Sequence, residues 1–211
     1  MSEQQPAPTV TLPSLASDAP TSSQLPQLHR PRNPGMPLDL DWIARVQANT
    51  SAIERRAATL PGRRTVKKTY QAAWLARAIT CIDLTTLSGD DTPGRVRRLC
   101  AKARQPLRAD LLAALGLPPI TTGAVCVYHD MVATALDALE GSGIPVAAVS
   151  TGFPAGLSPS ALRVREIEES VRAGAAEIDI VISRRHVLTS NWQALYDEMR
   201  DFRAACGPAH V

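Results

Sequence analysis

Residues 176–182, Ala176-Glu-Ile-Asp-Ile-Val-Ile182, form an aliphatic run that carries two carboxylates. In a β-strand alternate side chains point to opposite faces, so the three isoleucines would share one face, and Glu177 and Asp179 the other. A charged group on a buried strand costs free energy unless it is paired, which makes both carboxylates candidates for chemistry. On this segment alone, a solvated edge strand with one polar face is the alternative.

Three earlier segments share this apolar character, and a helical pattern follows each of the four. We expect strands at 78–84, 124–128, 145–150 and 176–182, and a short additional helix at 109–115. Thr92 and Pro93 supply an N-cap and a first-turn proline for the first of the four helices. The apolar positions at helical spacing are Val96 and Leu99; Val132, Leu136 and Leu139; Val164, Ile167 and Val171; and Trp192, Leu195, Met199 and Phe202.

Strands and helices that alternate in this way predict an α/β fold with a parallel sheet covered by helices. A doubly wound sheet and a (β/α)8 TIM barrel both fit that pattern, and two observations favour the barrel. The segment after the first strand, Ser88-Gly-Asp-Asp-Thr92, lacks the G-x-G-x-x-G pattern of a dinucleotide-binding turn. Polar residues also recur at one parity of the strands, as the inner face of a barrel would require: Cys81, Asp83 and Thr85; Cys126 and Tyr128; Glu177 and Asp179.

The chain divides into three predicted parts. Residues 1–36 are rich in proline and serine without apolar periodicity, so we expect a disordered tail. Residues 37–78 predict an N-terminal helical extension, in which the basic run 63–68 is a solvated connector or, less simply, a phosphate or nucleic-acid patch. Residues 79–211 predict the first half of a TIM barrel, containing roughly the first four β/α units.

Composition limits the classes of function. The formal net charge is +3, so no strong field indicates nucleic acid or a membrane as a partner. No apolar run approaches the ~20 residues of a membrane span. The cysteines are too far apart for C-x-x-C metal or redox motifs, and without a signal peptide they predict free thiols in a reducing compartment, the cytoplasm: Cys81, Cys100, Cys126 and Cys206.

Four segments together resemble the deoxyribose-phosphate aldolase family, specifically its eukaryotic-type branch. They are Ile82-Asp-Leu-Thr-Thr-Leu87, Ala124-Val-Cys-Val-Tyr128, Thr151-Gly-Phe-Pro-Ala-Gly156 and Ala176-Glu-Ile-Asp-Ile-Val181, and Leu195-Tyr-Asp-Glu198 fits as well. The resemblance implies a class I aldolase of deoxyribonucleotide and carbohydrate catabolism on a (β/α)8 barrel. It would cleave 2-deoxy-D-ribose 5-phosphate into D-glyceraldehyde 3-phosphate and acetaldehyde through a lysine Schiff base, with no metal and no cofactor.

The same resemblance implies site residues. Asp179 would be catalytic, moving a proton between the substrate hydroxyl and the enamine carbon, and Glu177 would place a second carboxylate beside it. Asp83 would hydrogen-bond in the site, or else form a salt bridge inside the barrel. We expect Cys126 to line the pocket and not to act as a nucleophile. Thr85 and Thr151 would hydrogen-bond substrate or cap strand ends.

The lysines do not fit the family's pattern. The family carries its Schiff-base lysine and a helper lysine on the sixth and seventh strands, and its phosphate cradle mainly after the seventh and eighth. Here no lysine follows Lys102, and Lys67 and Lys68 precede the first strand. We therefore expect a C-terminally truncated aldolase, with a fifth strand about to begin where the sequence stops, that is inactive alone and self-associates through open barrel edges. The alternatives are a non-catalytic half-barrel with an interaction or regulatory role, and a doubly wound binding protein for another phosphorylated ligand.

Overall fold

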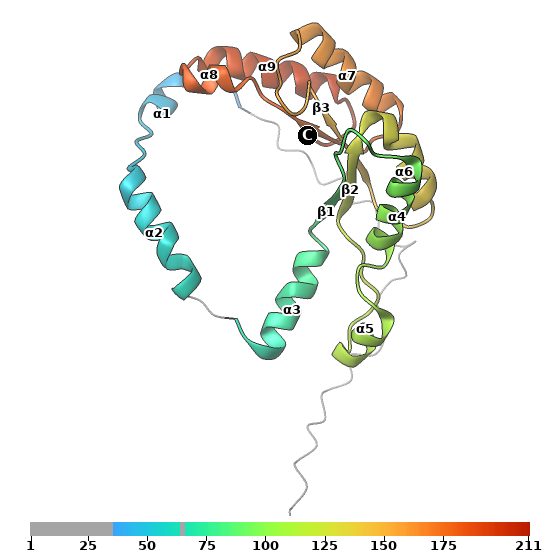
Figure 1. Cartoon of the computed structure of the whole chain (residues 1–211). Helices are drawn as coiled ribbons and strands as arrows, with labels where there is room; N and C mark the ends of the chain where they lie inside the picture. Colours follow the sequence, from blue (N-terminus) through green and yellow to red (C-terminus); the bar gives the residue numbers. More distant parts are fainter. Residues whose placement is uncertain (1–35, 64–65) are drawn as a thin grey trace, which may run out of the picture. The chain divides into compact units, whose positions relative to one another are not determined.

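The computed structural model describes residues 36–63 and 66–211 (Figure 1). The predicted disordered tail therefore lies outside the described residues apart from Met36, and so do residues 64 and 65 of the basic run. Two helices, α1 (Leu40–Ala44) and α2 (Thr50–Arg63), stand where the sequence shows its first helical pattern. Asp39 caps α1, because its carboxylate accepts a hydrogen bond from the backbone N–H of Trp42 at 2.9 Å.

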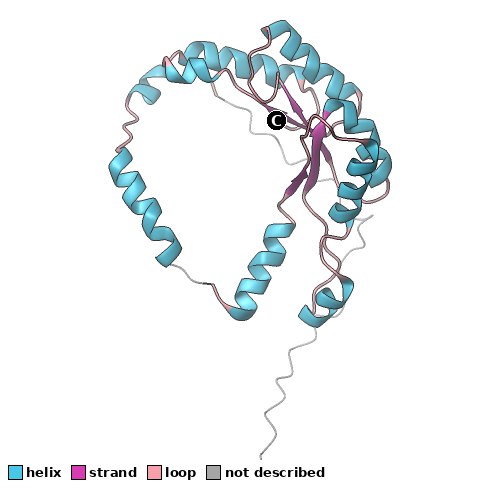
Figure 2. Cartoon of the chain, viewed as in Figure 1, coloured by secondary structure: helices cyan, strands magenta, loops and turns pink. Residues whose placement is uncertain are grey.

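Four parallel strands make up the sheet, in the order β1-β2-β3-β4 (Figure 2). Their bounds are β1 Asp83–Thr85, β2 Ala124–Tyr128, β3 Val146–Ser150 and β4 Glu177–Ile180. Each strand lies beside its predecessor, whereas the chain of a doubly wound sheet reverses direction across the sheet at a switch point. The parallel α/β prediction is confirmed, and the strand order is that of a TIM-barrel-like fold.

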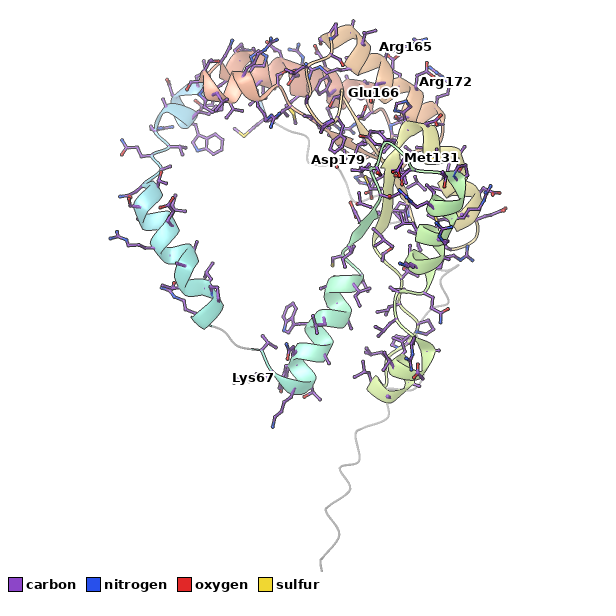
Figure 3. All side chains as sticks on the ribbon, in the orientation of Figure 1. Lys67, Met131, Arg165, Glu166, Arg172 and Asp179 are labelled. Carbon is purple, nitrogen blue, oxygen red and sulfur yellow. The ribbon has the colours of Figure 1, made fainter. Side chains whose placement is uncertain are left out.

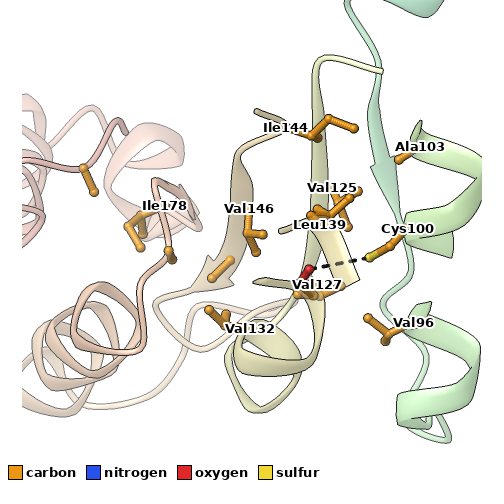
Figure 4. Close-up of a cluster of buried hydrophobic side chains, with 14 of the residues drawn as sticks. Val96, Cys100, Ala103, Val125, Val127, Val132, Leu139, Ile144, Val146 and Ile178 are labelled. Atoms are coloured by element: carbon orange, nitrogen blue, oxygen red, sulfur yellow. Dashed lines mark hydrogen bonds between the residues drawn. The ribbon is translucent and has the colours of Figure 1, made fainter. Parts of the chain in front are cut away.

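Helices cover one face of this sheet. They are α4 (Pro93–Arg104), α6 (Val132–Leu139), α7 (Ser160–Arg172) and α9 (Trp192–Ala205). Helix α4 packs beside α6, and α7 beside α9. Figure 4 shows the core between helices and sheet, where Val125, Val127 and Val146 of the strands meet Val96 and Val132 of the helices. Burial of this apolar face is the main contribution that holds the layers together.

Local signals place several helix ends as expected. Thr92 accepts a hydrogen bond from the N–H of Arg95, and Pro93 occupies the first turn of α4. Helix α5 (Ala109–Leu115) has the predicted bounds and ends at Gly116, whose φ of 64° lies in the left-handed region that glycine adopts without strain. These features depend on neighbouring residues alone, which explains why they could be predicted.

The predicted start of the first strand was wrong, because β1 begins at Asp83 and not at residue 78. Helix α3 (Lys68–Ile79) includes Ala78 and Ile79, the first two residues of the segment that we assigned to the strand. Alanine has the highest helix propensity, so the helix extends to Ile79 before the chain turns. Strand β4 is also shorter than the predicted 176–182, and β3 begins one residue later than expected.

The buried faces of two helices, α6 and α9, also differ from the prediction. Leu136 of α6 is 37% exposed, and Ala135 takes the buried position beside Val132 and Leu139. In α9 the buried residues are Phe202, as expected, and Glu198, a charged residue. Helix α8 (Arg184–Leu188) and a 3-10 turn, η1 (His129–Met131), were not predicted, since each is about one turn long and has no periodicity to detect. Among the described helices none is long and apolar enough to span a membrane.

Candidate active site on the helix-free face of the sheet

Strand register brings the predicted polar residues onto one face. The parallel ladders pair Thr85 with Cys126, Cys126 with Ala147, and Ala147 with Glu177. Paired residues in neighbouring strands point to the same side of a sheet, so these four form one row. A second row contains Tyr128, Val149 and Asp179 by the same register. The face opposite the helices therefore carries the candidate site, as the recurring parity of polar residues indicated.

A hollow of about 390 Å³ lies on this face. Asp83, Glu177 and Asp179 line it, and Ala147 forms part of its floor. Ala147 has the smallest side chain in the middle of its row, so space remains between Asp83 of β1 and Glu177 of β4. Beside the hollow, Cys126, Ala147 and Val149 form a small apolar cluster with Leu87, Tyr128 and Phe153.

Asp179 is exposed and lies on β4, where Figure 3 labels it. Within the described part of the chain its carboxylate makes no hydrogen bond or ion pair, and the same holds for the carboxylate of Asp83. The salt bridge considered for Asp83 is therefore not observed among these residues. Both carboxylates are free to meet a ligand that enters the hollow.

The negative charges of the hollow act on their neighbours. The pKa of the Glu177 carboxyl is raised by burial and by the charge of Asp83, while His210 opposes that rise. The pKa of the Cys126 thiol is raised to about 11 by burial and by the charges of Asp179 and Asp83. A thiol with this pKa is protonated near neutral pH, which agrees with a lining role for Cys126 and not a nucleophilic one.

The two threonines have different surroundings. Thr151 is fully buried directly after β3, and its hydroxyl accepts the N–H of Val181 at 2.6 Å and lies 3.0 Å from the Val181 carbonyl oxygen. These contacts join the ends of β3 and β4, which favours the strand-end capping alternative. Thr85 is exposed on the site face, and its hydroxyl donates to the carbonyl of Asp83 at 2.8 Å.

The prediction missed a buried ionic network behind the site. Arg163 of α7 pairs with Glu198 of α9, and both side chains are almost completely buried. Glu198 also accepts hydrogen bonds from the N–H of Ser183 at 2.7 Å and from its hydroxyl at 2.6 Å. The network therefore positions the chain directly after β4. Charged residues in amphipathic helices usually face solvent, so periodicity offered no signal, although Glu198 lies in the segment 195–198 that resembles the aldolase family.

The free edge of β4 is partly paired. His210 forms a parallel bridge with Glu177: its N–H donates to Ala176 at 2.9 Å, and its carbonyl accepts from Ile178 at 2.8 Å. This single bridge lies on the side of β4 that faces away from β3. Among the described residues, no three His, Cys, Asp or Glu side chains gather closely enough to hold a metal ion together.

Comparison with known proteins identifies relatives for this arrangement. No protein-family model matches the chain. Deoxyribose-phosphate aldolase from Bos taurus is 55% identical over 181 residues, which cover 84% of this chain and 57% of that protein. The Homo sapiens enzyme of the same name is 55% identical over 183 residues, covering 85% of this chain and 58% of that protein. The chain is a homologue of the deoxyribose-phosphate aldolases.

This aldolase homologue therefore spans less than two thirds of the length of the relatives it matches. Solved structures agree with the fold. A protein described as a deoxyribose-phosphate aldolase from Coccidioides immitis superposes with a TM-score of 0.53 at 24% identity, over 75% of this chain and 56% of that one. A protein of the same description from Toxoplasma gondii gives 0.52 at 19% identity, over 67% and 50%. At these identities the likeness supports the TIM-barrel-like fold of the homologue and nothing more specific.

Proposed function

We propose that this chain carries the acid–base part of a deoxyribose-phosphate aldolase active site, with 2-deoxy-D-ribose 5-phosphate as substrate. One observation carries the proposal: the register of four parallel strands places Asp83, Cys126, Glu177 and Asp179 on the same helix-free face of the sheet. The homology to enzymes named deoxyribose-phosphate aldolase supports the reaction class, a carbon–carbon lyase.

The reaction determines what each side chain would do. In a class I aldolase an amine forms a Schiff base with the carbonyl carbon, which withdraws electrons from the breaking carbon–carbon bond. A base must take the proton of the substrate hydroxyl, and an acid must return a proton to the enamine carbon. We assign this transfer to Asp179, whose exposed carboxylate has no partner among the described residues. Asp83 and Glu177 would accept hydrogen bonds from substrate hydroxyls, and Cys126 would line the pocket.

The Schiff-base amine is not on this face. Lys67 lies just before α3 (Figure 3), and Lys68 begins that helix. Lys102 is exposed on α4, which covers the opposite face of the sheet. Arginine does not replace lysine, because its guanidinium stays protonated. We therefore propose that the 211-residue chain alone does not cleave the substrate and that a lysine from another segment or chain completes the site.

Borohydride trapping tests this second statement. The purified chain is incubated with acetaldehyde and sodium borohydride, and intact mass and peptide mapping locate any reduced adduct. We expect no adduct that depends on Asp179. An adduct on Lys67, Lys68 or Lys102 that disappears in Asp179→Asn would show that the chain forms its own productive Schiff base.

A chimeric protein tests the assignment of Asp179. Residues 36–211 would be joined to the part of the human relative that lies beyond the matched region, and release of glyceraldehyde 3-phosphate would be followed in a coupled assay. We expect aldolase activity, and a loss of about 10²–10⁴-fold in kcat for Asp179→Asn, the usual contribution of a general acid–base group. A cooperatively folded chimera that is inactive, or whose Asp179→Asn variant keeps full activity, would contradict the proposal.

The face that no described helix covers also favours a second candidate, a half-barrel that associates with another aldolase chain or with itself and has no activity alone. Co-purification of this chain with a second aldolase chain would distinguish this candidate from the first. We place either function in the cytoplasm, because the four cysteines are all free in the structure.

A further inference from the structure

A pocket of about 290 Å³ lies between the segment that follows β3 and the segment that follows β4. Its lining includes Ser158, Ser160, Arg163, Arg184 and Arg185, none of which lines the hollow with Asp179. The volume is at the low end for small-molecule sites, so it suits a ligand of a few heavy atoms.

The first turn of α7 opens into this pocket without a cap. Pro159 occupies the N-cap position, and no side chain accepts a hydrogen bond from the helix start. The N–H groups of Ser160 and Ala161 have no acceptor inside the helix, as in the first turn of any helix. An uncapped N-terminus of a 13-residue helix carries partial positive charge and favours an anion.

Arginine side chains add to this preference. Arg184 and Arg185 are exposed, and within the described part of the chain neither makes an ion pair. Arg163 is paired with Glu198, so those two charges cancel. The side chains around the pocket therefore leave two uncompensated positive charges, those of Arg184 and Arg185.

A buried donor in the lining provides an independent observation. Arg163 is 4% exposed, and its terminal nitrogens contact Glu198, Ser183 at 3.1 Å and the carbonyl of Val181 at 3.5 Å. Its Nε, in contrast, is buried and has no hydrogen-bond partner. A buried donor without an acceptor costs free energy, and because Arg163 belongs to the lining of this pocket its Nε is a candidate donor to an anion bound there.

We propose that this pocket binds the phosphate group of a small phosphorylated metabolite, at a site separate from the candidate active site. The backbone N–H groups of α7 and the hydroxyls of Ser158 and Ser160 would contact the phosphate oxygens, with Arg184 and Arg185 closing over them. The position is unlike that of the phosphate cradle implied by the aldolase resemblance, which follows the seventh and eighth strands. Both segments around the pocket continue from strands of the candidate active site, so an occupied pocket would stabilise the ends of β3 and β4.

Isothermal titration calorimetry with inorganic phosphate, against sodium chloride at matched ionic strength, tests the proposal on the 211-residue chain. We expect one saturable phosphate site, weakened about tenfold or more in Arg184→Gln/Arg185→Gln because charge-assisted hydrogen bonds are lost. The matched control is Arg97→Gln/Arg98→Gln, an exposed pair of neighbouring arginines on α4. The proposal would be overturned if the parent chain bound no phosphate. It would also be overturned if the two double variants bound phosphate with the same affinity, whether that affinity was unchanged from the parent chain or equally reduced.

A second variant removes the site without removing charge from the arginines. In Ser160→Asp the new carboxylate occupies the uncapped start of α7, where it is favourable for the helix. We expect this variant to keep or raise the melting temperature and to lose phosphate binding. A folded Ser160→Asp chain that binds phosphate with unchanged affinity would contradict the assignment of the pocket, whatever the arginine variants show.

Discussion

At the scale of single residues, the clearest consequence of the site geometry concerns Cys126. Cys126 pairs with Thr85 on the site face of the sheet, and burial together with the charges of Asp179 and Asp83 raises the pKa of its thiol to about 11. We expect exposed Cys81 to react with iodoacetamide well before Cys126 at pH 7.5, since alkylation requires an accessible thiolate. The rate of Cys126 alkylation should still increase with pH at pH 10, because its thiol is not yet fully ionised there.

Asp179→Asn provides the control for this prediction. The charge of Asp179 raises the pKa of Cys126, so neutralising it should lower that pKa and increase alkylation at pH 9 to 10. Peptide mass spectrometry over a pH series measures both rates. A rate for Cys126 that reaches its plateau near pH 8 would show that the thiol does not sense these carboxylates.

Glu198 carries the largest expected stability effect of a single residue. Glu198→Ala would leave the buried Arg163 without its partner, which typically costs about 3–5 kcal/mol of unfolding free energy. Urea unfolding followed by circular dichroism measures this loss. The control is Glu168→Ala on α7, whose ion pair with Arg165 is exposed and should contribute no more than about 1 kcal/mol.

The stabilisation by Glu198 should also depend on pH. Burial alone would raise the pKa of Glu198, but hydrogen bonds from Ser183 and the charge of Arg163 hold it below the ordinary value of 4.5. A carboxyl with a lowered pKa in the folded state stabilises fully above pH 4.5 and loses that contribution as the pH falls through the folded pKa. The stability difference between the parent chain and Glu198→Ala should therefore shrink below pH 4.5. A constant difference down to pH 2 would contradict this account.

At the scale of elements, the segment after β3 closes tightly on the segment after β4. Gly156 has a φ of 68°, and a Cβ at this position would lie 2.8 Å from Cγ1 of Val181 and 3.3 Å from the carbonyl oxygen of Ile182. Gly156→Ala should therefore cost about 1–3 kcal/mol, through backbone strain and a displaced contact. Thermal unfolding measures the change.

Gly89→Ala is the matched control, because a Cβ there meets no atom within 4 Å and its φ is outside the left-handed region. We expect a change within about 0.5 kcal/mol. Equal effects of the two alanine substitutions would mean that the close approach at Gly156 does not contribute to stability.

At the scale of the whole molecule, the sheet has strands with incomplete pairing. Strand β1 pairs only with β2, and the outer edge of β4 is occupied only at His210 among the described residues. Unpaired edges, and a sheet face that none of the described helices covers, favour association between chains. We expect sedimentation velocity to show species heavier than 22.6 kDa whose fraction rises with concentration.

Charge at the β1 edge should oppose this association. Ile82 is 42% exposed just before β1, so Ile82→Lys should shift the distribution toward monomer, since lysine on an edge disfavours pairing. Leu188→Lys on α8, where the leucine is 84% exposed, is the control and should leave the distribution unchanged. A compact monomer at all concentrations would exclude association through the sheet edges.

Much of the architecture was predictable from local patterns. The bounds of β2 and α5, the Thr92–Pro93 start of α4 and the side-chain parity of β4 all depend on neighbours within a few residues. Covalent geometry sets the periodicity of strands and helices, so such features can be predicted from the sequence. The same parity predicts Asp179, Glu177, Cys126 and Asp83 on one face of the sheet.

Other features required the tertiary structure, because they depend on contacts between distant residues. The burial of Arg163 against Glu198 joins positions 35 residues apart, and no local pattern distinguishes these charges from solvent-exposed ones. The hydroxyl of Thr151 likewise hydrogen-bonds to the backbone of Val181, which lies 30 residues away in the sequence. Strand register and packing determine which polar groups meet, since an unpartnered polar group is costly only once the folded chain has excluded water from it.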